Sequence, residues 1–202
     1  MTKIESVGWF DAPDLYTRMV KEFPKGHFVE IGAWMGRSTK FMGKLIKDTE
    51  IVFDVVDHFK GNLDHSYQQE VVKLYGGCIY KQFKRNMEKE NCWAEINQVH
   101  VEYSSDAVNH YKNESLDFVY IDASHDYPQV AYDIEKAINY FKNPIIVLDD
   151  YGNPNNTNIR RSINKKVQDG KLKIHKNIGE YPGFKTKSGW SMIDREGVIC
   201  NV

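Results

Sequence analysis

The stretch HFVEIGAWMGRST, residues 27–39, decides the prediction of the fold. A short apolar run leads into a turn bounded by two glycines, Gly32 and Gly36, and a helical pattern follows the turn. A strand, a glycine turn and a helix in this order usually bind a phosphate, because the backbone N–H groups at a helix N-terminus attract anions. Glu30 argues against that interpretation, since its carboxylate would repel a phosphate. The stretch therefore predicts a ligand-binding turn whose ligand has to tolerate an acid.

Along the rest of the chain, short apolar runs alternate with helical patterns, which is typical of an α/β domain with a mostly parallel sheet. The runs that predict strands lie at residues 27–32, 51–57, 96–103, 116–122, 143–150, 172–177 and 189–200. Apolar residues recur at helical spacing over residues 37–47 and 126–141, which predicts two helices. In the second helix, Asp126 is placed to act as the cap and Pro128 lies in the first turn.

No internal repeat or low-complexity linker interrupts this alternation, so we expect a single domain over residues 1–202. Residues 58–97 are too long for a simple crossover between two strands. We expect this segment, together with residues 177–188, to form loops or insertions on the substrate side. Loops beyond the strand ends of an α/β sheet commonly shape the binding site.

The composition limits the partners and the compartment. The chain has 202 residues and a formal net charge of −1, so it lacks the basic excess that favours nucleic-acid binding. Cys78, Cys92 and Cys200 show no Cys-x-x-Cys spacing, which argues against a disulfide framework and a cysteine zinc site. Neither a signal-peptide pattern nor an apolar run of membrane-spanning length is present. We expect a cytoplasmic protein that acts on a small molecule, without nucleic acid or membrane as a partner; a homo-oligomer stays open.

Two phosphate-binding motifs can be compared with the glycine turn. In the dinucleotide fingerprint G-x-G-x-x-G, the second glycine lets the backbone approach a pyrophosphate. Here the spacing is Gly32-x-x-x-Gly36, and Trp34 occupies the position of that second glycine. A P-loop requires Gly-Lys followed by Ser or Thr, and this does not follow the turn. The spacing and Glu30 together disfavour both motifs.

Acidic residues dominate the carboxyl ends of the predicted strands, which form the edge where ligands of open α/β sheets bind. Strand by strand, this edge carries Glu30, Gly32 and Gly36, then Asp57, then Ser105 and Asp106, then Asp122, and finally Asp149 and Asp150. An edge rich in carboxylates attracts a cationic ligand.

These residues resemble a known family. EIGAWMGRST at residues 30–39 is similar to the first motif of class I S-adenosylmethionine-dependent methyltransferases, and VVDHFKG at 55–61 is similar to their second motif. LDFVYIDASHDYPQVAYDI at 116–134, followed by VLDDYG at 147–152, resembles the small bacterial and phage subfamily that carries IDxxHxY after the fourth strand. The resemblance implies a Rossmann-like α/β fold: a seven-stranded, mostly parallel sheet with helices on both faces and an antiparallel last strand.

The resemblance also implies roles at the matching positions. Gly32 would allow close approach of S-adenosylmethionine, and Glu30 would interact with its methionine portion. Asp57 would accept hydrogen bonds from both ribose hydroxyls, although it could also act as a strand-end cap. Ser105 and Asp106 would lie near the adenine. The full set expected to contact the cofactor is Glu30, Gly32, Trp34, Gly36, Ser38, Asp57, Ser105, Asp106 and Asp122.

Asp122, Asp149 and Asp150 follow two neighbouring strands and form a candidate site for Mg²⁺, which prefers oxygen ligands. The arrangement is similar to the metal site of catechol-type O-methyltransferases, although Asp-Asp stands where that pattern has Asp-Asn. A metal there would lower the pKa of an acceptor hydroxyl. The expected function is therefore O-methylation of a small-molecule hydroxyl, with a sugar suggested by family analogy. Asp149 and Asp150 could instead simply open a turn.

The catalytic candidates are Asp122 and His125. His125 fits either a general base beside the sulfonium or a loop histidine bonded to the backbone. Ser124, His125 and Asp126 are not expected to form a catalytic triad, because adjacent side chains diverge. Two other functions stay open: a metal-dependent, hydroxylase-like enzyme on the same fold, and a non-catalytic cofactor-binding protein.

Overall fold

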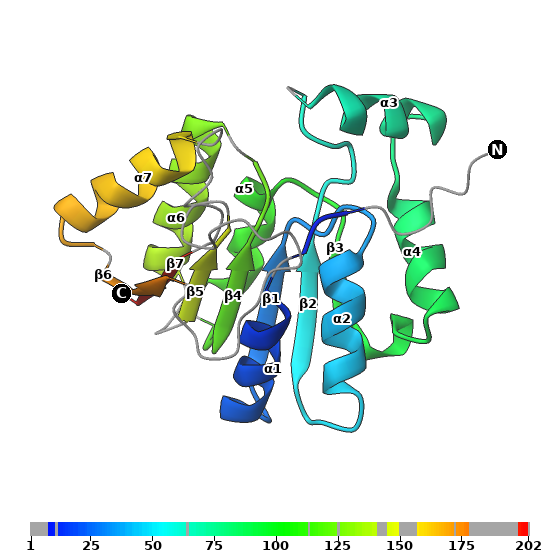
Figure 1. The fold of residues 1–202 in the computed structure, drawn as a ribbon, viewed down its shortest axis with the longest axis horizontal. Helices are drawn as coiled ribbons and strands as arrows, with labels where there is room; N and C mark the ends of the chain where they lie inside the picture. Colours follow the sequence, from blue (N-terminus) through cyan, green and yellow to red (C-terminus); the bar gives the residue numbers. More distant parts are fainter. Residues whose placement is uncertain are drawn as a thin grey trace, which may run out of the picture.

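A twisted sheet runs through the centre of the molecule (Figure 1). The computed structural model describes residues 8–10, 12–63, 65–112, 114–124, 126–140, 145–149, 157–171, 173–177 and 198–201. Within these residues, seven strands pair in the order β3-β2-β1-β4-β5-β7-β6. The strands are β1 His27–Ile31, β2 Val52–Val56, β3 Gln98–His100, β4 Phe118–Ile121, β5 Ile145–Leu148, β6 Lys173–Asn177 and β7 Val198–Asn201.

Strand pairing agrees with a Rossmann-like fold. β1 to β5 pair in parallel, whereas β7 is antiparallel to both of its neighbours, β5 and β6. The strand order reverses beside β1, because β2 lies on one side of it and β4 on the other. The register places Ile31 opposite both Val56 and Ile121, so these three strands end at the same level. The predicted fold class is confirmed, and the reversal point is where such sheets bind ligands.

Helices cover both faces of the sheet, as Figure 1 shows. One face packs against α1 (Pro13–Glu22), α2 (Arg37–Ile46) and α4 (Tyr80–Lys89). The other packs against α5 (Ser104–Ala107), the 3-10 helix η2 (Val108–Tyr111), α6 (Tyr127–Tyr140) and α7 (Thr157–Gln168). Alternate strand residues point to opposite faces, so Phe28 belongs to the first core while Val29 and Ile31 belong to the second.

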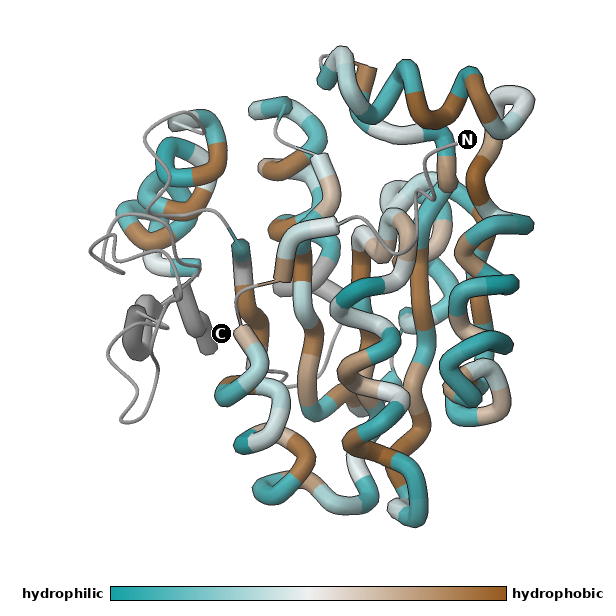
Figure 2. The backbone as a smooth tube through the Cα atoms, turned by 45° about the vertical axis from the view of Figure 1, so that its right-hand side comes forward, coloured by the Kyte–Doolittle hydropathy of each residue, from teal (hydrophilic) through white to brown (hydrophobic). Residues whose placement is uncertain are grey.

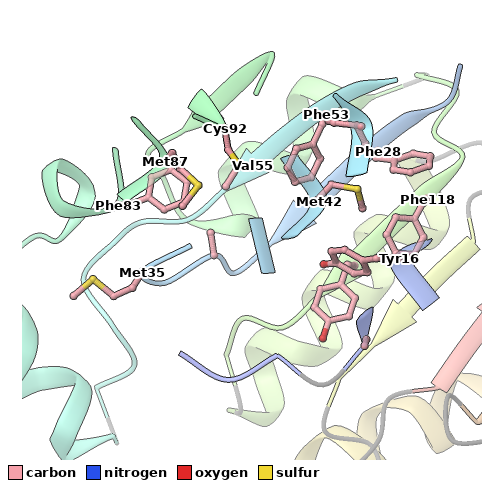
Figure 3. Close-up of a cluster of buried hydrophobic side chains, with 14 of the residues drawn as sticks. Tyr16, Phe28, Met35, Met42, Phe53, Val55, Phe83, Met87, Cys92 and Phe118 are labelled. Carbon is pink, nitrogen blue, oxygen red and sulfur yellow. The ribbon is translucent and has the colours of Figure 1, made fainter. Parts of the chain in front are cut away.

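Burial on both faces explains why the strands read as nearly continuous apolar runs. The hydropathy colouring of Figure 2 shows hydrophobic residues along the central strands, whereas the helices alternate between hydrophobic and hydrophilic residues. Figure 3 shows part of the first core, where Phe28, Phe118 and Tyr16 gather on one side. The Phe28 and Phe118 rings meet edge to face at 5.3 Å, and Tyr16 meets Phe118 in the same way at 5.6 Å.

The predicted helices over 37–47 and 126–141 are confirmed as α2 and α6. The long segment 58–97 contains α3 (Ser66–Leu74), α4 and the 3-10 helix η1 (Trp93–Glu95). α3 lies beyond the carboxyl ends of the central strands (Figure 1). Of the second expected insertion, residues 178–188 lie outside the described residues. In the part of the chain that the structure describes, none of the helices has the length and hydropathy needed to cross a membrane.

Candidate functional site

The turn after β1 depends on glycine for a reason that the sequence did not reveal. Gly32 has φ +96°, and a Cβ placed on it would lie 1.9 Å from the backbone oxygen of Asp122. Gly36 has φ +87°, and its Cβ would lie 2.4 Å from Cε of Met87. Gly32 is therefore required by the close approach of the backbone that follows β4, whereas Gly36 is favoured by its positive φ, because the flexible end of Met87 can move aside. Both positions favour glycine before any ligand is considered.

A cavity of about 480 Å³ opens at the carboxyl ends of β1, β2 and β4. Its walls come from the glycine turn, from residues between 56 and 63 after β2, from residues 103 and 104 after β3, and from residues 122–124 after β4. Its volume lies within the roughly 300–1,000 Å³ that is typical of small-molecule sites. Of the residues predicted to contact a cofactor, Gly32, Trp34, Asp57 and Asp122 line this cavity.

Asp57 joins the end of β2 to the glycine turn. Its Oδ2 accepts hydrogen bonds from the backbone N–H groups of Ala33 at 2.9 Å and Trp34 at 2.7 Å. Its Oδ1 accepts a third from the N–H of Phe59 at 2.6 Å. The strand-end cap that the sequence left open is therefore present. The same carboxylate also lines the cavity, so one side chain shapes the turn and faces the ligand space.

Glu30 lies below the turn and does not line the cavity. It is buried between α1 and α2, where its carboxylate accepts hydrogen bonds from the Tyr16 hydroxyl at 3.3 Å and the Thr39 hydroxyl at 2.5 Å. Ser38 is also buried and bonds to Glu30 rather than lining the cavity. Burial raises the pKa of Glu30 to about 7, and the hydrogen bonds from Ser38, Thr39 and Tyr16 oppose that rise. The structure thus places Glu30 on the core side of β1.

Trp34 occupies the centre of the turn in a left-handed conformation, with φ +50°. Such a conformation is uncommon for a bulky residue, and strained residues concentrate at functional sites. The indole lines the cavity, and a Cβ on Gly61 would lie 3.2 Å from its Cζ3. Its Nε1 is buried without a hydrogen-bond partner among the described residues. Trp34 therefore joins the cavity wall and carries a donor that the described protein leaves unused.

Of the three carboxylates expected to hold a metal, two belong to the described residues. Asp122 lines the cavity, and its backbone N–H donates to the Ile31 oxygen at 2.8 Å. Asp149 is half-buried, does not line the cavity, and bonds to the Tyr120 hydroxyl. Asp150 and the catalytic candidate His125 lie outside the described residues. The prediction of Mg²⁺ is therefore not supported by the described geometry.

A family comparison identifies the domain. The profile of a family described as a methyltransferase domain matches residues 29–151, more than half of the chain. The matched span holds the carboxyl ends of all the strands around the cavity. The chain belongs to this methyltransferase domain family. No curated protein sequence is significantly similar to it, and the IDxxHxY subfamily stays a prediction.

Solved structures share the fold of this methyltransferase domain at low identity. The O-methyltransferase from Bacillus cereus in complex with SAH is 15% identical, with a TM-score of 0.61, covering 98% of this chain and 83% of that one. TomG of Streptomyces achromogenes in complex with SAM is 9% identical, with a TM-score of 0.60, covering 97% and 81%. CalS11, a TDP-rhamnose 3′-O-methyltransferase, is 14% identical, with a TM-score of 0.58, covering 94% and 76%.

The wall after β3 comes from the two residues directly before Ser105. Tyr103 and Ser104 line the cavity of the methyltransferase domain, whereas Ser105 and Asp106 do not. Ser104 begins α5, and its hydroxyl donates to Oδ1 of the buried Asp133 at 2.7 Å. This contact between α5 and α6 turns Ser104 inward and leaves Asp106 exposed. The contact of Ser105 and Asp106 with the adenine stays a prediction.

Residues after β2 complete the wall, and the sequence reasoning did not name them individually. The rings of His58 and Tyr103 lie 4.7 Å apart, and Nζ of Lys60 lies 5.6 Å from the centre of the Tyr103 ring. Burial lowers the pKa of His58. Asn62 donates from its side chain to the Ala123 oxygen at 3.1 Å. These contacts tie the loops after β2, β3 and β4 together, and their only sequence signal was the excess length of segment 58–97.

Proposed function

We propose that this chain transfers a methyl group from S-adenosylmethionine to a hydroxyl group of a small molecule. The cavity at the carboxyl ends of β1, β2 and β4 carries the proposal. It lies where open α/β sheets bind their ligands, and it belongs to a methyltransferase domain. Solved structures of the same fold support the cofactor, since the Bacillus cereus enzyme is in complex with SAH and TomG with SAM.

The residues around the cavity fit a cationic cofactor that carries hydroxyl groups. Asp57 and Asp122 place two carboxylates in the wall, which favours the ammonium and sulfonium of S-adenosylmethionine. The buried Nε1 of Trp34 can donate to an acceptor on a ligand, which would satisfy a donor that is costly to leave unpaired. When bound, S-adenosylmethionine supplies an electrophilic methyl group.

The contribution of the protein is alignment and removal of a proton. An acceptor hydroxyl has to be held in line with the methyl donor and deprotonated as it reacts. Asp122 in the cavity wall is the proposed base, and His125 remains the alternative outside the described residues. The segment between β2 and α3 is proposed to face the acceptor. Leu63 lines the cavity there and is yet 90% exposed, as an apolar contact at its mouth would be.

A sugar hydroxyl is the proposed acceptor class. CalS11, a TDP-rhamnose 3′-O-methyltransferase with the same fold, supports testing nucleotide sugars first. Assistance by Mg²⁺ stays a prediction that rests on Asp122 and on the Asp149–Asp150 pair. Methyl transfer from labelled S-adenosylmethionine to a panel of nucleotide sugars, glycosides and phenols tests both points. Loss of turnover in EDTA that Mg²⁺ restores would support the metal, and unchanged turnover in EDTA would contradict it.

Calorimetric titration of the full chain with S-adenosylmethionine tests the cofactor directly. We expect S-adenosylmethionine and S-adenosylhomocysteine to bind and to raise the Tm. NAD⁺ shares the adenosine portion but carries a pyrophosphate, so it serves as the control ligand and should not bind. Neither heat nor a rise in Tm with S-adenosylmethionine, at protein concentrations in the micromolar range, would refute the proposed function.

A further inference from the structure

Three potential metal ligands meet beside the edge strand of the sheet, outside the methyltransferase cavity. His100 is the last residue of β3, Glu102 follows two residues later, and His110 belongs to η2. One ligand atom from each lies within 4.8 Å of the other two. A metal site needs at least three His, Cys, Asp or Glu side chains close together. Among the described residues, these three meet that condition. None of them lines the cavity.

The three side chains lie near enough to one another to be rearranged around one small divalent ion. Oε1 of Glu102 lies 2.9 Å from Nε2 of His110 and 3.5 Å from Nδ1 of His100. Zinc bonds to histidine nitrogen and carboxylate oxygen are about 2.0–2.2 Å long, so tetrahedral ligand atoms lie about 3.3–3.6 Å apart. The two imidazole rings are stacked, with centroids 4.5 Å apart and an angle of 19° between the planes. Because the lone pair of an imidazole nitrogen lies in the ring plane, the exposed His110 ring has to turn out of this stack for both histidines to bind one ion.

The local backbone explains why these residues converge. Residues two apart along an extended chain point to the same side, which places His100 and Glu102 together. The turn through α5 and η2 brings His110 back to them. The His100 ring is held edge to face against Tyr111 at 5.6 Å, and the Tyr111 hydroxyl donates to Asp54 at 3.1 Å. One ligand is thus fixed by the core of the protein before any ion binds.

Exposure and charge suit an ion that arrives from solvent. The side chain of His100 is 12% exposed, that of Glu102 34% and that of His110 52%. His100 therefore holds the site against the protein, and an ion can reach it past His110. Two imidazoles and one carboxylate form a ligand set typical of zinc, whereas Mg²⁺ prefers oxygen ligands alone.

We propose that His100, Glu102 and His110 bind one Zn²⁺ ion, with the fourth position left to water. The ion would join the end of β3 to η2 and close the loop between them. That loop carries Tyr103 and Ser104, which form part of the cavity wall. The ion is therefore assigned a structural role that steadies this wall from outside, and the methyl transfer itself does not pass through it.

Metal binding by the full chain, with any purification tag removed, tests this site without the cofactor. Calorimetry with Zn²⁺ alone should show one ion per chain, and Co²⁺ should give the visible absorption of a tetrahedral site. We expect His110→Ala and Glu102→Gln to weaken Zn²⁺ binding about tenfold or more. Glu114→Gln changes an exposed carboxylate nearby and should bind as the wild type does.

The outcomes separate the site from other metal ligands on the chain. Wild-type affinity in both His110→Ala and Glu102→Gln would overturn the proposal, and so would the absence of Zn²⁺ binding to the wild type. Zn²⁺ should also raise the Tm of the wild type and of Glu114→Gln, but not that of His110→Ala. Because His110 and Glu102 are partly or largely exposed, these variants are expected to fold, and circular dichroism checks that they do.

Discussion

Glu30→Gln distinguishes two roles for Glu30: a direct contact with the methionine portion of S-adenosylmethionine, and a buried carboxyl group within the protein core. The carboxyl group is 1% exposed and lies between Tyr16 and Thr39. Burial raises its pKa from the ordinary 4.5 to about 7. Between these two values, the folded protein holds a proton that the unfolded chain has already released. The free energy of unfolding therefore falls as the pH rises from about 4.5 to about 7, and the loss is complete above that range.

The size of this loss follows from the rise in pKa. One pH unit corresponds to about 1.4 kcal/mol, so the buried charge of Glu30 costs about 3 kcal/mol at pH 8 compared with pH 4. Gln has nearly the same shape but no proton to lose. The difference in stability between Glu30→Gln and the wild type should therefore move by about 3 kcal/mol in favour of the variant across this range. Any fixed cost of the new amide is the same at each pH.

Urea unfolding of both proteins at pH 4.5, 5.5, 6.5, 7.5 and 8.5 measures this difference. Subtracting the wild-type free energy of unfolding removes the pH dependence that the two proteins share. Glu70→Gln is the matched control, because it makes the same chemical change at an exposed carboxylate. A difference for Glu30→Gln that does not change with pH would refute the reasoning. Calorimetry with S-adenosylmethionine tests the other role, since a direct contact to the methionine portion predicts weaker binding, whereas the buried position predicts unchanged affinity.

Three further predictions follow from the walls of the cavity. Gly32→Ala should lower the stability by at least about 1–3 kcal/mol because its Cβ meets the backbone, whereas Gly76→Ala, also at positive φ but in open space, shows the conformational part alone in thermal unfolding. Asp57→Asn should weaken S-adenosylhomocysteine binding about tenfold or more in calorimetry. Wild-type affinity would mean that Asp57 only holds the glycine turn and does not bind the cofactor. Ser104→Ala should cost about 1–3 kcal/mol in urea unfolding above pH 6, and less below it, because burial raises the pKa of its partner Asp133 to about 6; an equal loss at pH 5 and pH 8 would contradict this.

Local patterns in the sequence were sufficient for the sheet and for two helices. Strand runs such as 116–122 are apolar because parallel strands are buried on both faces. Each strand can therefore be recognised from its own residues. α1 was not predicted, although Leu15, Tyr16 and Met19 form a buried stripe at helical spacing. α3 and α4 were expected only as part of a long segment, because their amphipathic patterns are short and mostly polar.

The candidate site was predicted less completely than the fold. Gly32, Asp57 and Asp122 were named from strand ends, and all three line the cavity. Tyr103 and Ser104 were missed because the inward face of α5 depends on Asp133, 29 residues away. The group of His100, Glu102 and His110 was missed because nothing in the sequence marks the turn that returns His110 to β3.

The sequence by itself determined the alternation of strands and helices, the glycine turn and an edge rich in carboxylates, because each depends on neighbouring residues. The tertiary structure alone decided which carboxylate faces which surroundings. Glu30 lies within β1 and Asp57 directly follows β2, yet Glu30 is enclosed by Tyr16 of α1 and Thr39 of α2 while Asp57 reaches the cavity. The physical reason is that Glu30 lies within a paired strand and faces the side that α1 and α2 cover, whereas Asp57 lies past the end of β2, where its carboxylate bonds to the glycine turn. What covers each side is settled by segments that are distant in the chain.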